Sequence, residues 1–239
     1  MKTIGLLGGM SWESTSEYYR ILNELTRDKL GGLHSAKIIL HSFDFAEIAQ
    51  LQHSSRWNDL ENMLIEAAKG LELAGADCIV ICTNLMHKVA DKLEASISIP
   101  LIHIADAVAM KIKSDGIKKV GLLGAKYTMK ESFYVDRLKT HNIETIIPND
   151  SDCDIVHDMI YNELCQGKFT DASRKKLESI IENLCNDGAE GVILGCTELP
   201  ILLPPSENKL RLYDSMFLHA AAASNFAFLP TRITSLMSA

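Results

Sequence analysis

The stretch "IGLLGGMSWESTSEYYRILNEL" (Ile4 to Leu25) decides the fold, because the chain repeats its pattern as "VGLLGAKYTMKESFYVDRLKTH" (Val120 to His141). A second phrase behaves in the same way, since "GADCIVICTN", from Gly75, returns as "GAEGVILGCTE", from Gly188. Both matches keep their order and nearly the same separation, which indicates duplication or internal pseudosymmetry. We therefore expect two similar halves with a crevice between them.

Short apolar runs alternate with longer amphipathic stretches along both halves. The runs are "TIGLLG", "AKIILHSF", "CIVICT", "PLIHIA", "KVGLLG", "ETIIP" and "GVILGCT". This alternation indicates parallel strands joined by crossover helices. We predict two pseudosymmetric α/β domains, each with a mainly parallel central sheet flanked by helices and with the active site in the crevice between them. The predicted domains are residues 1–100 and 101–209, and we expect residues 210–239 to pack back on the first.

Composition narrows the class of partner. The 239 residues include 24 basic and 31 acidic side chains, for a net charge of -7. This balance argues against nucleic acid and against an anionic membrane surface as partners. No apolar run approaches the roughly 18 residues of a membrane span, and the first residues lack a signal-peptide pattern. We therefore expect a cytoplasmic protein that binds a small molecule, with its six scattered cysteines reduced.

The candidate site lies at the ends of four predicted strands. Ligands of open α/β sheets bind beyond the carboxyl ends of the strands. The four ends are "GGMS" (Gly8–Ser11), "CTN" (Cys82–Asn84), "GAKYT" (Gly124–Thr128) and "GCTE" (Gly195–Glu198). We expect these ends to rim one site.

Two registers of the repeat assign different partners to Cys196. Matching letters pairs it with Cys82 but needs an insertion, whereas counting without a gap from the shared Gly-Ala pairs it with Thr83. Strand side chains alternate between the two faces of a sheet, so the registers differ by a complete change of face. We favour the ungapped register, because buried strands tolerate insertions poorly. Cys82 would then face the covering helices.

The chain resembles the cofactor-independent aspartate/glutamate racemases over essentially its whole length. The motifs that carry the resemblance are "IGLLGGM" (Ile4–Met10), "CTNLMHK" (Cys82–Lys88), "IPLIHIADA" (Ile99–Ala107), "VGLLG" (Val120–Gly124), "GVILGCTELP" (Gly191–Pro200) and "DSMFLHAAAA" (Asp214–Ala223). "GGMSWEST" and "LGGLHSAKIILHSFDFAEI" further resemble the branch of broad-specificity amino-acid racemases.

The resemblance implies a reaction and a set of site residues. In such enzymes two cysteines face opposite sides of the substrate Cα, and one removes a proton while the other delivers one. The implied enzyme is a homodimer that acts on an amino acid and needs neither pyridoxal phosphate nor a metal. We expect Cys196 and Thr83 to carry out the proton transfers. The expected substrate-binding residues are Met10, Asn84, Leu85, Thr197 and Glu198.

The chain departs from the family's pattern in three places. Aligning the first motif on its asparagine puts Thr83 where the cysteine belongs, as the ungapped repeat also does, and a hydroxyl is a far weaker acid than a thiol. Asp44 and Glu47 lie in a segment where strict aspartate racemases tend to place an arginine, and Cys165 stands where they tend to place a lysine. Both changes weaken the case for an acidic substrate side chain, although Lys168 could substitute.

Other functions stay open at this point. A decarboxylase or a cis-trans isomerase of the same fold would use Cys196 alone, and a binder of amino acids or other small carboxylates would perform no chemistry. A nucleotide-binding module is disfavoured, because "GLLGG" lacks the G-x-G-x-x-G spacing. His87 and His103 fit structural roles better than a zinc site with Cys82, since no recognised ligand spacing is present.

Overall fold

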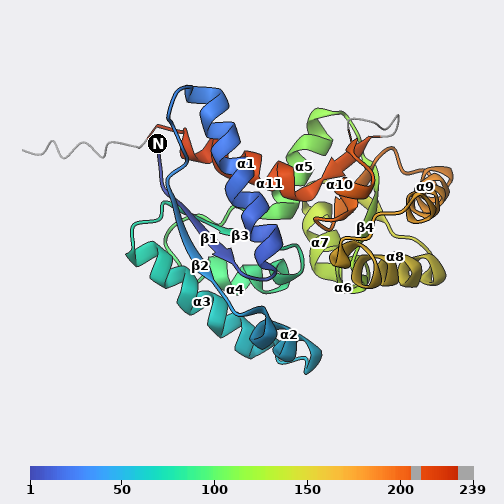
Figure 1. Ribbon diagram of the computed structural model, residues 1–239, viewed down its shortest axis with the longest axis horizontal. Coiled ribbons are helices and arrows are strands. Elements are labelled where there is room, and N and C mark those ends of the chain that lie inside the picture. The colour runs from blue at the N-terminus through green and yellow to red at the C-terminus, as the bar shows by residue number, and fades with distance from the viewer. Residues whose placement is uncertain (206–210, 231–239) are drawn as a thin grey trace, which may run out of the picture.

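Two parallel sheets form the centre of the molecule, one in each half of the chain (Figure 1). The computed structural model describes residues 1–205 and 211–230. The first sheet has the order β2-β1-β3, with β1 (Ile4–Gly8), β2 (Ile38–Ser42) and β3 (Cys78–Ile81). The second has the order β5-β4-β6-β7, with β4 (Lys119–Gly124), β5 (Glu144–Ile146), β6 (Val192–Gly195) and β7 (Leu212–Asp214). All neighbouring strands are parallel, which confirms the predicted α/β fold class.

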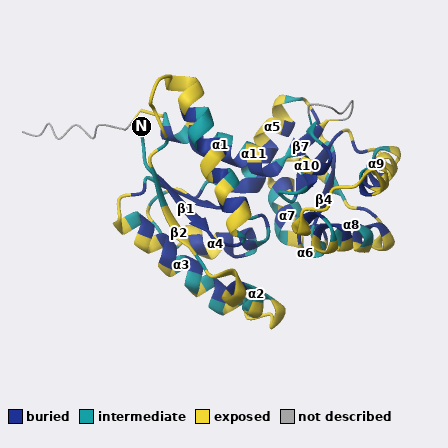
Figure 2. Cartoon of the chain, in the orientation of Figure 1, coloured by how far each residue is buried: buried dark blue, intermediate teal, exposed yellow. Residues whose placement is uncertain are grey.

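Helices cover both faces of each sheet. On the first sheet, α1 and α11 pack on one face and α2, α3 and α4 on the other. On the second sheet, α5 and α7 pack on one face and α8, α9 and α10 on the other. Figure 2 shows the inward faces of these helices buried and the outward faces of α3 and α9 exposed. The helices are α1 (Trp12–Leu30), α2 (Phe45–His53), α3 (Trp57–Leu73), η1 (Leu85–Val89), α4 (Ala90–Glu94), α5 (Ile104–Ser114), α6 (Lys126–Lys130), α7 (Ser132–Thr140), α8 (Asp150–Asn162), η2 (Leu164–Gln166), α9 (Asp171–Asn186), α10 (Leu199–Leu202) and α11 (Ser215–Ala227).

A glycine turn carries the chain from β1 directly into α1. Gly9 has φ +83°, and a Cβ built there would lie 2.2 Å from the Phe43 carbonyl oxygen. Only glycine fits a position that combines this conformation with such a close approach. The Ser11 side chain then accepts the Ser14 backbone N–H and begins α1. Met10 and Ser11 are therefore held at the carboxyl edge of the first sheet.

The apolar run "PLIHIA" forms a single bridge instead of the expected strand. Leu101 bridges to Ile79, and α5 begins at Ile104. The reason is local, because the His103 side chain accepts the Ala105 backbone N–H and caps the helix. The chain thus leaves the first sheet after one residue of pairing.

The C-terminal segment is shared between the halves. β7 pairs with β6 and extends the second sheet. α11 then returns to the first half, where Met216, Ala220 and Ala223 pack in one cluster with β1, β3 and α1. Figure 1 shows α11 lying between α1 and α5. Within the described residues, α11 is thus the part of this segment that packs on the first half. Residues 231–239 lie outside the described residues, and the division of the chain near residue 100 stays a prediction.

Candidate active site

A cavity of about 140 Å³ lies where the four strand ends meet. This volume is smaller than the roughly 300–1,000 Å³ of drug-sized ligand sites, so the cavity suits a small metabolite. All seven site residues expected from the sequence line it, namely Met10, Thr83, Asn84, Leu85, Cys196, Thr197 and Glu198. The strand ends expected to rim the site also contribute Ser11, Ala125, Thr128 and Gly195. The sequence did not point to five further residues that line the cavity, namely Ser14, Phe45, Gln52, Ile160 and Tyr161.

The pairing of strands is equivalent in the two halves. In the first sheet Gly5 pairs with Ile79, and in the second its repeat counterpart Gly121 pairs with Val192. Counting forward equally along β3 and β6 places Thr83 at the position of the cysteine that follows β6. The two sheets therefore have the ungapped register.

Cys82 and Thr83 point to different environments. Cys82 is fully buried in the cluster that contains Cys78, Val80 and the inward residues of α1 and α11, and burial raises the pKa of its thiol far above the usual range. Thr83 lines the cavity. Its carbonyl accepts a hydrogen bond from His87 Nδ1 at 2.9 Å, which ties the end of β3 to η1. The side chain available to a ligand is therefore the hydroxyl.

Cys196 lies beside a carboxylate. Its Sγ donates to Glu198 Oε2 at 2.9 Å, and the Thr197 hydroxyl donates to the same oxygen at 2.7 Å. Burial, and then the negative charge of Glu198, raise the pKa of the Cys196 thiol well above its usual range. The thiol is therefore protonated at rest, and Glu198 is placed to receive its proton.

A second thiol lines the same cavity. Cys165 follows the first residue of η2 and is exposed as a residue, but its thiol is partly buried. This partial burial, together with the carboxylate of Glu198, raises the pKa of the thiol to about 12. Among the described residues that line the cavity, none is lysine or arginine.

The two acidic departures from the family's pattern, Asp44 and Glu47, and the possible substitute Lys168 all lie outside the cavity. Asp44 and Glu47 line a separate groove between β2 and α3. The Lys168 ammonium donates to Gln166 Oε1 at 2.8 Å, and this lysine does not line the cavity. Glu198 is thus the one charged side chain on the described wall of the cavity.

Asn84 presents an unpaired acceptor. The Ser215 hydroxyl donates its single proton to the Leu194 carbonyl at 2.8 Å, so it must accept from Asn84 Nδ2, 3.2 Å away. This orients the amide and leaves Asn84 Oδ1 buried, with no hydrogen-bond partner in the part of the chain that the structure describes. A buried unpaired acceptor is costly, and a donor on a bound ligand, such as an ammonium group, would satisfy it.

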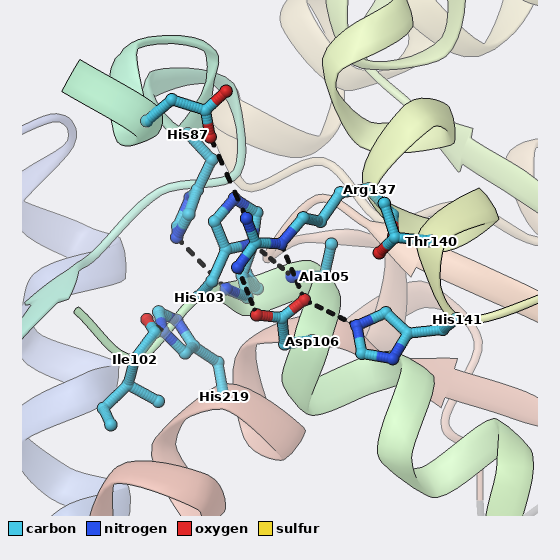
Figure 3. A network of polar contacts seen from close by, with 11 residues as sticks. His87, Ile102, His103, Ala105, Asp106, Arg137, Thr140, His141 and His219 are labelled. Atoms are coloured by element: carbon cyan, nitrogen blue, oxygen red, sulfur yellow. Dashed lines mark hydrogen bonds and ion pairs between the residues drawn. The ribbon is translucent and has the colours of Figure 1, made fainter. Parts of the chain in front are cut away.

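Three histidines form a buried cluster next to the site (Figure 3). The ring of His87 lies 4.6 Å from that of His103 and 5.4 Å from that of His219 between centroids. His87 accepts the Ile104 N–H at Nε2, so its proton is on Nδ1, the atom that bonds Thr83. His219 bonds Tyr18 and the Ile102 carbonyl. These histidines are structural, and no group of three His, Cys, Asp or Glu in the described chain could hold a metal ion.

The fold and the cavity together define a class: a two-domain α/β protein with a small cavity between the domains, lined by Thr83 and Cys196 from equivalent strand ends. Residues 7–223 match the Asp/Glu/Hydantoin racemase family. The chain therefore belongs to that family, whose members include racemases.

Individual relatives agree with this assignment. The crystal structure of a candidate Asp/Glu racemase from Yersinia pestis is 49% identical, with a TM-score of 0.91 over 95% of this chain and 99% of that one. That of an aspartate racemase homologue from Pyrococcus horikoshii is 35% identical, with a TM-score of 0.86 over the same shares. The broad specificity amino-acid racemase RacX of Bacillus subtilis is 23% identical over 89% of this chain and 92% of its own length. In the described part of this chain, no helix is long and apolar enough to cross a membrane.

Proposed function

We propose that this protein is a cofactor-independent amino-acid racemase in which Cys196 and Thr83 act on opposite faces of the substrate Cα. The observation that carries the proposal is that both side chains line one small cavity from equivalent strand ends. Family membership and the racemases among the relatives support the reaction class. A cytoplasmic homodimer is part of the same proposal.

The chemistry begins at Cys196. Glu198 takes the thiol proton, and the resulting thiolate removes the Cα proton of the enantiomer that presents it. Backbone amides at the strand ends stabilise the enolate-like intermediate at the substrate carboxylate. The substrate ammonium donates to Asn84 Oδ1, which has no hydrogen-bond partner among the described residues. A proton from the Thr83 hydroxyl, directly or through a bound water, then reaches the opposite face of Cα. Glu198 releases the proton it took to solvent, and the Thr83 side regains one from solvent, which restores the resting site.

The two faces are chemically unequal. A threonine hydroxyl gives up its proton far less readily than a thiol, so steps on the Thr83 side limit turnover. The equilibrium constant between enantiomers is one in an achiral solvent, which makes kcat/KM equal for the two. The inequality therefore appears as different kcat and KM values that compensate each other, and as faster Cα exchange from the enantiomer that faces Cys196.

The cavity favours a substrate with an uncharged side chain. An acidic side chain would need a cation to offset its desolvation, and the described wall offers Glu198 but no lysine or arginine. Phe45, Ile160 and Tyr161 supply apolar surface instead. The broad range stated in the name of the Bacillus subtilis relative fits this proposal.

Hydrogen exchange in D₂O tests the function. Each enantiomer of a panel of amino acids is incubated with the pure protein, and loss of the Cα proton signal is followed together with chirality. We expect exchange with at least one uncharged amino acid, loss of exchange in Cys196→Ala, and retention in Cys82→Ala. Absence of exchange with every amino acid would overturn the racemase proposal.

One observation favours a second candidate. Because Thr83 replaces the second thiol, the site also fits an isomerase or a decarboxylase that uses Cys196 alone. Such an enzyme would turn over its own substrate and lose activity in Cys196→Ala without inverting any amino acid. A non-catalytic binder, in contrast, would keep its ligand affinity in that variant.

A further inference from the structure

A chain of hydroxyl groups leads from the mouth of the cavity to the carboxylate beside Cys196. Ser11 Oγ lies 3.3 Å from Ser14 Oγ, and Ser14 Oγ lies 3.1 Å from Thr197 Oγ1. Thr197 Oγ1 in turn donates to Glu198 Oε2 at 2.7 Å. The contact between Ser14 and Thr197 crosses from the first half to the second.

The direction of the hydrogen bonds follows from counting protons. Thr197 has one hydroxyl proton, and it is donated to Glu198, so Thr197 must accept from Ser14. Ser14 then has no proton left for Ser11 and must accept from it. All three hydroxyl protons therefore point toward Glu198, which is the arrangement required to pass a proton inward.

We propose that Ser14 is a proton-relay residue that connects Glu198 and Cys196 with solvent during turnover; this rests on the proposed racemase function. In the inward step Ser11 takes a proton from a hydronium ion at the mouth and passes its own proton to Ser14. Ser14 passes its proton to Thr197, and Thr197 passes its proton to Glu198. One proton leaves the solvent and one carboxylate becomes neutral, so charge balances, and the reverse sequence releases a proton.

The positions of the residues support a path that stays open when the cavity is occupied. A substrate in a cavity of about 140 Å³ displaces the water that would otherwise reach Glu198. Ser14 lines the cavity with only 7% of its surface exposed, and its hydroxyl contacts Thr197 directly, so no water is needed between them. Ser11 is half-buried beside the exposed Trp12. The relay crosses from the first half to the second at the contact between Ser14 and Thr197.

The test measures how often the hydrogen removed from Cα is exchanged with solvent before a hydrogen is returned to Cα. The reaction is started in D₂O from the enantiomer that presents its Cα proton to Cys196. The exchange ratio is the amount of deuterium in the recovered starting enantiomer divided by the amount of opposite enantiomer formed. A working relay replaces the abstracted proton with deuterium before it returns. We expect Ser14→Ala to lower this ratio by about tenfold or more, because a positioned proton-transfer group typically contributes at least that factor.

Matched variants separate the relay from folding. Ser14→Ala keeps the backbone N–H that Ser11 caps, and Ser14→Thr restores a hydroxyl and the ratio. Ser16→Ala, an exposed serine in the same turn whose hydroxyl bonds Glu13, should leave the ratio unchanged. Should Ser14→Ala not fold, Thr197→Val interrupts the same chain from the other half and should lower the ratio equally.

The outcomes are distinguishable. A wild-type protein that exchanges and inverts its substrate, with the same ratio in Ser14→Ala or Thr197→Val, overturns the relay and leaves the racemase intact. A ratio that falls in Ser14→Ala and is not restored by Ser14→Thr assigns Ser14 a packing role and also overturns it. Absence of any exchange in the wild type overturns the racemase, and the relay with it.

Discussion

Acid should destabilise this protein well above the pH at which its carboxylates titrate, because of the buried histidines. Burial, and then the positive charge of Arg137, lower the pKa of His103 to about 3, and burial lowers that of His219 to about 4. Burial also lowers the pKa of His87. All three stay neutral in the folded protein at pH values where a histidine in the unfolded chain is protonated.

The sign and size follow from linkage. Above pH 6.5 both states are neutral and the folded state keeps its full stability; below it, only the unfolded chain binds protons, and stability falls until the folded pKa is reached. Between pH 7 and pH 5 the loss is about 2 kcal/mol for each of His103 and His219. Asp106, held at a pKa of about 2 by Arg137 and His141 despite its burial, adds nothing in this window.

Urea denaturation from pH 8 to pH 5 measures the effect as a free energy of unfolding. Below pH 6, the slope of the free energy of unfolding against pH should be smaller in His219→Gln than in the wild type by about 1.4 kcal/mol per pH unit, whatever the absolute stability of that variant. A slope that is the same in the wild type and in His219→Gln between pH 7 and pH 5 would refute the reasoning.

Three further changes probe the site. Thr83→Cys should raise kcat by about tenfold or more, because a thiol replaces a much weaker acid, and should bring the kcat values of the two enantiomers together in a chiral assay. Glu198→Gln should lower the pH at which iodoacetamide half-maximally alkylates Cys196, followed by peptide mass mapping, since the carboxylate raises the pKa of that thiol. Cys82→Ala should cost about 1 kcal/mol in urea denaturation and leave Cα exchange unchanged.

Much of the site could be predicted from the repeat, since equivalent strands end at equivalent edges. The ungapped count from Gly75 and Gly188 identified Thr83 as the counterpart of Cys196, and strand pairing in the structure has the same register. Period-two alternation likewise predicted that Cys82 would face the helices. These inferences succeeded because they use local geometry, which short stretches of sequence determine.

Features that depend on how the halves meet could not be predicted in this way. Ser14 contacts Thr197 although 183 positions separate them along the chain, and nothing near Ser14 in the sequence signals that contact. The bond from Cys196 to Glu198 depends on the irregular turn before α10. "PLIHIA" has the composition of a strand, but the side chain of His103 caps a helix there, and a local polar contact overrides apolar composition.

The return of α11 to the first half also has a consequence for synthesis. The apolar face of the first sheet that carries Ile4, Leu6 and Val80 is completed by Met216 and Ala220, which are translated more than a hundred residues later. N-terminal domains generally fold while the rest of the chain is still being made. Here the emerging N-terminal half must keep part of its apolar surface uncovered until the end of the chain leaves the ribosome, and chains that stop before α11 would expose that surface to chaperones and proteases.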